Sequence, residues 1–363
     1  MRAAVLREVG QPTAVEELTL RPLRRHEVRV QLAASGVCHS DLSLRDGSIP
    51  MLLPGTLGHE GAGVVTEVGD DVTNVGPGQH VVLTWLVACR SCAHCLRGES
   101  QLCMHAYDHV YGAPYAESAA GPVWPGMGVG SLAEETLLPA AAVVPVDESL
   151  PLDHAALLGC GLTTGVGAVT RTAAVRPGES VLVIGCGGVG LAAIQGARLA
   201  GAAPIIAADR VAAQLPAAIA NGASNTIDAS EVDLTAAVRD LTGGDGVDHG
   251  IEVVGKPSTI RAAYDATRRG GKVTLVGAAG IEESVTFPAL SLMADGKTIQ
   301  GSVYGASDPP RDIPMLAELA RRGLLDLEAL VTRRIGLDDV ETAFTDMAAG
   351  RGARSVVCFE TTT

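Results

Sequence analysis

The chain has 363 residues, enough for about two domains of ordinary size, each with its own core. Apolar residues make up 47% and charged residues 19%, and there are 44 glycines, which excludes a disordered chain and favours a turn-rich globular protein. The formal net charge of −14 argues against nucleic acid or an anionic membrane as a partner, because both would be repelled by this surface.

The N-terminal segment carries charged residues, Arg2 and Arg7 among them, where a secretory signal needs an apolar core. No uninterrupted apolar stretch reaches the roughly 18 residues of a membrane-spanning helix. We therefore expect a cytoplasmic protein with no membrane partner. Thiols stay reduced in that compartment, which suits metal binding better than disulfide bonding.

Up to about residue 160 the sequence consists of short alternating segments separated by Gly, Pro and Asp, as at 27–32 and 63–68. This pattern predicts a β-rich domain. Within it, four cysteines are closely spaced: Cys89, Cys92, Cys95 and Cys103. Such spacing lets one loop supply all four thiolates to a zinc ion, and a closed four-sulfur site predicts a structural zinc; the alternative is a set of scattered thiols or disulfides. The segment that follows, 107–130, carries no motif.

From about residue 177 apolar runs alternate with helical patterns. This alternation predicts an α/β domain with a doubly wound parallel sheet. We expect helices at 190–199 and 212–221 and strands at 180–184, 205–208, 226–228, 247–253, 272–276 and 298–301. After these, a helix at 313–322 and a final strand at 355–359 are expected.

A glycine-rich turn of the G-x-G-x-x-G form follows the first strand of this domain; its residues are Gly185, Cys186, Gly187, Gly188, Val189 and Gly190. The match alone is weak, but an apolar strand before it and an Ala-rich helix after it predict a pyrophosphate site at the helix N-terminus. Asp209 lies about 20 residues further on and would bind the ribose hydroxyls. Arg210 could host a 2′-phosphate, so NADP stays open, although the carboxylate favours NAD.

Three more candidate metal ligands occur in short glycine-containing segments: Cys38, His59 and Cys160. Taken singly, each could be an ordinary buried cysteine or histidine. In order along the chain, however, Gly-Val-Cys-His-Ser-Asp, Gly-His-Glu-Gly-Ala-Gly, the four-cysteine loop, Gly-Cys-Gly, the glycine-rich turn and Asp209 resemble the zinc-dependent medium-chain alcohol dehydrogenases, over essentially the whole length.

The resemblance implies a GroES-like catalytic domain at 1–161 and 304–363 around a Rossmann domain at 162–303. It implies two zinc ions per subunit, with the catalytic zinc held by Cys38, His59 and Cys160 and its fourth position left for water or substrate. Ser40 would take the alcohol proton, and hydride would pass to NAD. Asp41 and Glu60 match positions where a carboxylate orients the histidine or approaches the metal.

Further roles are carried over from the family. His39 and Arg354 would face the pyrophosphate and Thr164 would pack on the nicotinamide. The substrate pocket would be lined by Ile49, Trp85 and Val303. Ser43 stands where many relatives have a relay histidine, which the aryl-alcohol branch also lacks, so proton exit must use water, His39 or a shorter path.

The substrate expected from a tryptophan-lined pocket is a primary alcohol with an aromatic, long-chain or allylic substituent. Alternatives on the same scaffold are an S-hydroxymethylglutathione dehydrogenase and a nicotinoprotein that retains its NAD. A zinc-free quinone or enoyl reductase would lack both cysteine sets, and a non-catalytic binding protein would lack a ligand or relay residue. The resemblance also implies a homodimer or homotetramer, paired through an edge strand at 297–304.

Overall fold

The computed structural model describes residues 1–352 and 354–360, which group into two compact units. Unit 1 contains residues 1–161, 308–323 and the described residues from 331 onward. Unit 2 contains residues 162–307 and 324–330. The chain therefore leaves the first unit twice, for residues 162–307 and for the short segment 324–330, and returns to it each time.

Unit 1 is rich in β-structure, as predicted. Its strands are β1 (Arg2–Leu6), β2 (Ala14–Glu17), β3 (Thr19–Leu20), β4 (Glu27–Gly36), β5 (Gly55–Thr56), β6 (Glu60–Val68), β7 (His80–Leu83), β8 (Ala116–Ser118), β9 (Gly121–Pro125), β10 (Glu135–Pro139), β11 (Val143–Pro145), β18 (Arg333–Ile335) and β19 (Ser355–Cys358). They form one sheet in the order β2-β1-β5-β9-β8-β3 and another in the order β11-β7-β6-β4-β19-β18, in which β10 also pairs with β4. The predicted strands at 27–32, 63–68 and 355–359 are confirmed within β4, β6 and β19.

Helices and short helical turns connect these strands. The helices are α1 (His39–Asp46), α2 (Ala93–Leu96), α3 (Leu152–Ala155), α10 (Pro309–Arg321) and α11 (Val340–Ala348), and the turns are η1 (Ser100–Leu102), η2 (Gly126–Gly128), η3 (Ala140–Ala142), η4 (Ala156–Gly159) and η9 (Leu337–Asp339). Fully buried Phe344 of α11 packs with Leu44 of α1 and Val357 of β19 in one apolar cluster. The C-terminal segment thereby supports the helix that begins after Cys38.

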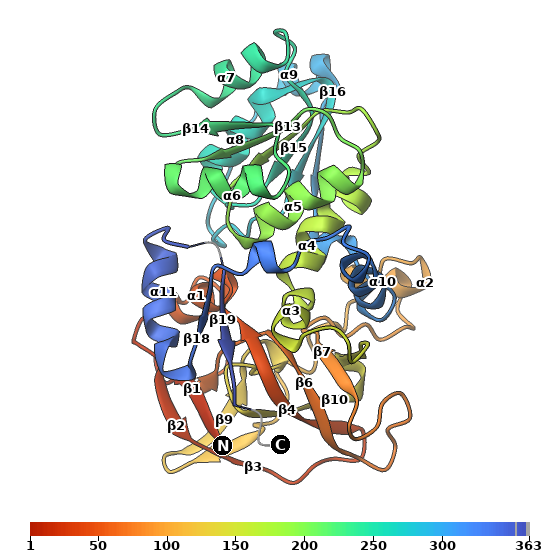
Figure 1. The fold of residues 1–363 in the computed structure, drawn as a ribbon, viewed down its shortest axis with the longest axis vertical. Helices are drawn as coiled ribbons and strands as arrows, with labels where there is room; N and C mark the ends of the chain where they lie inside the picture. The colour runs from red at the N-terminus through yellow and green to blue at the C-terminus, as the bar shows by residue number, and fades with distance from the viewer. Residues whose placement is uncertain (353, 361–363) are drawn as a thin grey trace. The chain divides into compact units, whose positions relative to one another are not determined.

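Unit 2 contains a parallel sheet in the order β14-β13-β12-β15-β16-β17, visible as the arrows at the centre of that unit in Figure 1. Numbered along the chain this order is 3-2-1-4-5-6, which is typical of dinucleotide-binding folds. The strands are β12 (Val181–Ile184), β13 (Ile205–Asp209), β14 (Asn225–Asp228), β15 (Val247–Glu252), β16 (Thr267–Leu275) and β17 (Thr298–Gly301). The doubly wound parallel sheet predicted from the sequence is confirmed.

The helical elements of unit 2 are α4 (Gly161–Gly167), the π-helical turn η5 (Ala168–Ala173), α5 (Gly188–Leu199), η6 (Ala212–Gln214), α6 (Leu215–Ala220), α7 (Leu234–Leu241), α8 (Pro257–Ala266), α9 (Ala289–Asp295), η7 (Val303–Ala306) and η8 (Glu328–Leu330). The helix predicted at 212–221 is divided into η6 and α6, where Pro216 lies in the first turn. Strand β16 begins earlier than predicted, and its pairing with β15 is irregular between Val247 and His249.

In the described residues no single helix is long and apolar enough to span a membrane; the pair Leu152–Gly159 and Gly161–Ala173 meets the length and composition criteria only when taken together.

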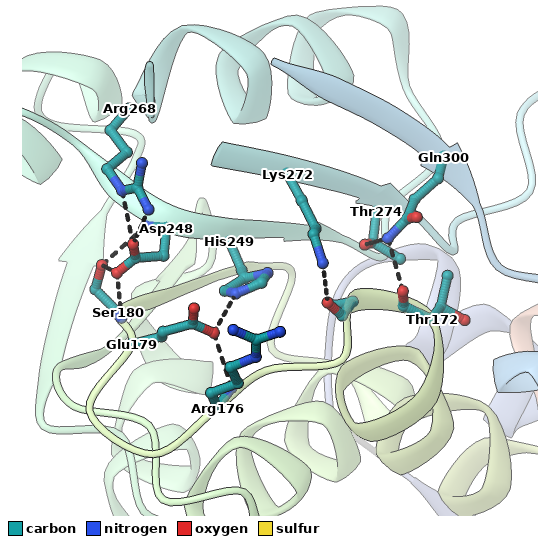
Figure 2. A network of polar contacts seen from close by, with 11 residues as sticks. Thr172, Arg176, Glu179, Ser180, Asp248, His249, Arg268, Lys272, Thr274 and Gln300 are labelled. Carbon is teal, nitrogen blue, oxygen red and sulfur yellow. Dashed lines mark hydrogen bonds and ion pairs between the residues drawn. The ribbon is translucent and has the colours of Figure 1, made fainter. Parts of the chain in front are cut away.

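A polar network lies at the start of β12 and β15 in unit 2, as Figure 2 shows. One oxygen of Asp248 accepts hydrogen bonds from the backbone N–H and the hydroxyl of Ser180, both at 2.7 Å. Its other oxygen accepts from Nε of Arg268 at 2.6 Å. Although burial raises the pKa of Asp248, the bonds from Ser180 and the Arg268 guanidinium lower it overall. The carboxylate thus joins the segment before β12 to β15 and β16.

Asp248→Asn is expected to lower the free energy of unfolding by about 1–3 kcal/mol at neutral pH, because an amide cannot accept all three bonds. A carboxylate whose pKa is lowered by folding stabilises the protein above its unfolded pKa and loses this effect as the pH falls through the folded value. The difference from wild type should therefore shrink below about pH 4 in denaturant titrations. Exposed Asp245 provides the control: Asp245→Asn should be neutral, and an equal effect would contradict the network's role.

Candidate functional site

Four side chains of unit 1 form a buried cluster, defined as Cys38, His59, Glu60 and Cys160. Each offers one ligand atom, and these atoms all lie within 4.8 Å of one another. Cys38 is the N-cap of α1, Glu60 opens β6, and Cys160 directly follows η4. None is more than 7% exposed. The structure thus brings together the three predicted zinc ligands and one predicted carboxylate.

Asp41 determines how His59 is presented. One oxygen of Asp41 contacts Nδ1 of His59 at 3.0 Å and accepts the backbone N–H of Gly58 at 2.9 Å. The other accepts the backbone N–H of Cys38 at 3.2 Å. With Nδ1 held in this way, the buried Nε2 of His59 has no hydrogen-bond partner.

An unpaired nitrogen buried beside two thiols is costly unless it binds something, and neutral imidazole with two thiolates is a donor set that suits zinc. The residues present therefore fit a catalytic zinc. The hydrogen bond to Asp41 fixes the tautomer in which Nε2 is the free ligand atom.

The two thiols of the cluster are electrostatically unequal. Their mutual hydrogen bond lowers the pKa of Cys38 well below its usual range and, together with burial, raises that of Cys160. Burial lowers the pKa of His59, but the charges of Asp41 and Cys38 raise it well above its ordinary value. Without a metal, these shifts favour a negative Cys38 thiolate beside a positive His59 imidazolium. A divalent cation bound among the ligands would replace the positive charge of the imidazolium.

Glu60 is held by two partners. One oxygen accepts the backbone N–H of Gly161 at 3.0 Å, and the other is ion-paired with Nη1 of Arg354. Burial raises the pKa of Glu60 to about 7, against the opposing effect of the guanidinium. Arg354 was predicted to face a phosphate. The structure gives it a partner inside the buried cluster, a contact that the sequence analysis missed because 294 residues separate the two.

The other predicted residues of unit 1 lie around α1 and β7. His39 is exposed in the first turn of α1, and the hydroxyl of Ser40 lies 4.0 Å from the sulfur of Cys38. Ile49 packs against the apolar cluster of α1 and α11. Trp85, 8% exposed, follows β7; contact with Cys38 and burial raise the pKa of Cys160, and the indole of Trp85 partly opposes that rise. Trp85 is thus the predicted pocket residue that contacts the buried cluster.

The second cluster consists of Cys89, Cys92, Cys95 and Cys103, whose sulfurs also lie within 4.8 Å of one another. Backbone N–H groups of Cys92 and His105 donate to its sulfurs, at 3.3 and 3.4 Å. Hydrogen bonds from Ser91 lower the pKa of Cys89 to about 5. All eight cysteines are free thiols, so this loop fits a four-thiolate zinc site and not a disulfide.

The glycine-rich turn of unit 2 lies at the end of β12, with Gly187 as the N-cap of α5. A Cβ on Gly190 would lie 1.8 Å from the carbonyl oxygen of Gly185, so only glycine fits there. A Cβ on Gly187 would meet nothing within 4 Å, which leaves the helix N-terminus open to an anion. The turn therefore fits a dinucleotide pyrophosphate. Gly188 and Val189, the first two residues of α5, are the other residues predicted to bind it.

Asp209 ends β13 beside this turn. Its two oxygens accept the backbone N–H groups of Cys186 at 2.7 Å and Val211 at 2.9 Å, while Arg210 is exposed. Each oxygen keeps a lone pair for a ribose hydroxyl.

Two more predicted residues belong to unit 2: Thr164 lies on α4 and is 8% exposed, whereas Val303 lies on η7 and is 42% exposed.

Comparison with known proteins identifies the family of the chain. Residues 24–148 match the family model described as alcohol dehydrogenase GroES-like domain, and residues 188–321 match zinc-binding dehydrogenase. The chain is 34% identical to S-(hydroxymethyl)glutathione dehydrogenase of Escherichia coli O1:K1 / APEC, covering 98% of this chain and 99% of that one.

Two solved structures are similar over 99% of both chains: an alcohol dehydrogenase zinc-binding domain protein from Burkholderia ambifaria (37% identity, TM-score 0.93) and benzyl alcohol dehydrogenase from Acinetobacter calcoaceticus (32%, 0.92).

Asp41→Asn should weaken zinc binding at the buried cluster by about 10–100-fold, because the amide no longer fixes the His59 tautomer. Zinc content after dialysis against a graded chelator is the measurement. The second cluster should keep its zinc, and Asp46→Asn, an exposed change on the same helix, should leave both sites unchanged. Loss of both ions together would point to unfolding and contradict a local effect.

Proposed function

Because the chain belongs to the zinc-dependent alcohol dehydrogenase family, we propose that it interconverts a primary alcohol and its aldehyde, with NAD as the hydride carrier. The observation that carries this proposal is the buried cluster, in which Nε2 of His59 is left without a partner beside two thiols. When bound there, zinc supplies the Lewis acidity that acidifies an alcohol, and NAD takes the hydride.

The chain's own residues have separate tasks in this proposal. Cys38, His59 and Cys160 hold the metal, and Asp41 orients the imidazole. The hydroxyl of Ser40 accepts the alcohol proton. With Ser43 in place of a relay histidine, the proton leaves through water, His39 or a shorter path, so turnover should not show the pH dependence of a histidine at position 43.

Glu60 lies beside the metal ligands and is ion-paired with Arg354. The guanidinium thereby compensates the negative charge of the buried carboxylate. In this assignment the two regions 1–161 and 304–363 carry the metal chemistry, and residues 162–303 bind the dinucleotide. The turn of Gly185, Gly187 and Gly190 receives the pyrophosphate.

Asp209 favours NAD over NADP. A carboxylate with one free lone pair on each oxygen can accept the ribose hydroxyls, and it repels a 2′-phosphate. Exposed Arg210 next to it is the feature that keeps some use of NADP open.

The substrate proposed is an aromatic, long-chain or allylic primary alcohol. Trp85 at the buried cluster and the similarity to benzyl alcohol dehydrogenase support it. S-(hydroxymethyl)glutathione is the second candidate, because the chain is 34% identical over nearly its full length to a dehydrogenase named for that substrate. A nicotinoprotein would differ from both by retaining NAD through purification.

NADH formation should be followed with ethanol, hexanol, benzyl alcohol, geraniol and S-(hydroxymethyl)glutathione, and NADPH formation with NADP. We expect turnover that a zinc chelator abolishes, that is faster with benzyl alcohol than with ethanol, and that prefers NAD. Tightly bound NAD with no response to added NAD would favour the nicotinoprotein. Absence of both turnover and bound cofactor would contradict the proposed function.

We also propose that the protein is a homodimer or homotetramer paired through β17. This strand is at the edge of its sheet, and α9 just before it exposes Leu290 and Met293, each to 72%. A free edge with exposed apolar side chains beside it is well suited to a second copy.

The double variant Leu290→Glu/Met293→Glu should shift the particle mass measured by light scattering to that of a smaller oligomer, because two charges would be buried at the contact. Leu241→Glu on α7, where the leucine is 42% exposed, is the matched control and should not change the mass. If both variants behaved as wild type, the interface would lie elsewhere.

A further inference from the structure

Tyr107 lies at the start of the segment 107–130, to which no motif assigns a role. Its ring is parallel to that of Trp85, with centroids 6.1 Å apart and an interplanar angle of 11°. These values are within the range of offset-stacked aromatic pairs. The four-cysteine loop ends four residues earlier, so the bend after Cys103 brings Tyr107 back to the end of β7.

The stacked pair begins at the buried cluster. Trp85 comes two residues after Leu83, the end of β7, and a Cβ on Gly159 would lie 2.7 Å from the carbonyl oxygen of Leu83. Gly159 is the residue before Cys160. The backbone that leads into Trp85 therefore lies next to a proposed metal ligand. Trp85 is 8% exposed and Tyr107 is 42% exposed, so Tyr107 is the more accessible residue of the pair.

The surrounding sequence is uncharged or acidic. Residues 98–170, which include Tyr107 and Cys160, contain no Lys or Arg and eight Asp or Glu. His105, two residues before Tyr107, already contacts Asp108 at 3.0 Å. This stretch therefore offers no lysine or arginine to a carboxylate of a substrate, and His105 is already paired.

We propose that Trp85 and Tyr107 form an aromatic shelf leading away from the buried cluster, and that Tyr107 is a specificity-determining residue for a planar, uncharged aryl or arylalkenyl alcohol. The inference rests on the proposed function, because it places the reacting oxygen at the buried cluster. A planar substituent extending from that oxygen passes the indole and stacks on the tyrosine ring. A linear alkyl chain gains less from a flat ring, and an anionic glutathione adduct finds no partner on this segment.

The test compares kcat/KM for cinnamyl alcohol, 3-phenylpropanol and hexanol in wild type, Tyr107→Phe, Tyr107→Leu and Tyr111→Leu. Cinnamyl alcohol extends a planar substituent, and 3-phenylpropanol carries the same ring on a flexible chain. Tyr111 is the control, an exposed tyrosine on the same segment. Tyr107→Leu should lower kcat/KM for cinnamyl alcohol about tenfold relative to hexanol, mainly through KM, while Tyr107→Phe and Tyr111→Leu keep the wild-type ratio.

An equal loss for cinnamyl alcohol and hexanol, or no change in their ratio, would overturn the shelf while leaving the proposed function intact. Zinc content measured on the same samples identifies a variant that failed to fold. If a variant fails to fold, the wild-type enzyme still tests the inference. Its kcat/KM must be higher for cinnamyl alcohol than for 3-phenylpropanol, and the opposite order overturns the inference. If wild type oxidised none of the alcohols, the proposed function itself would have failed.

Discussion

The site in unit 1 depends on one buried carboxylate. Asp41 accepts the backbone N–H groups of Cys38 and Gly58 and contacts Nδ1 of His59, so it joins the start of α1 to the turn before β6. A fully buried charge is stable only when such partners surround it. Because these same bonds turn Nε2 of His59 toward two thiols, the local fold and the metal chemistry have the same physical cause.

The two units divide the chemistry by the kind of structure each contains. Antiparallel strands, turns and caps in unit 1 bring ligands from distant segments to one buried point. In the parallel sheet of unit 2, β12 is followed by a glycine-rich turn in which the N-terminus of α5 favours an anion. Asp209 lies at the end of the next strand, β13. The buried cluster therefore depends on long-range packing, whereas the glycine-rich turn that fits a dinucleotide is a short continuous motif.

This difference explains what could be predicted. The parallel sheet, the glycine-rich turn and the four-cysteine loop are local patterns, and the sequence indicated all three. Cys38, His59 and Cys160 were recognised through a family resemblance, since no local rule joins them. The pairing of Arg354 with Glu60 and the stacking of Tyr107 on Trp85 were not predicted, because they arise from the path of the folded chain and leave no periodicity or motif. The division of residues 212–221 into two helical pieces was missed for a local reason, the effect of Pro216.

The central claim is that the buried cluster is a zinc site, distinct from the four-cysteine loop. Anomalous diffraction from crystals of the purified protein, recorded on both sides of the zinc absorption edge, tests it most directly. The account predicts two zinc peaks per chain, one among Cys89, Cys92, Cys95 and Cys103, and the other within bonding distance of Cys38, Cys160 and Nε2 of His59. A single peak at the four-cysteine loop, in protein prepared with zinc and without chelator, would contradict it.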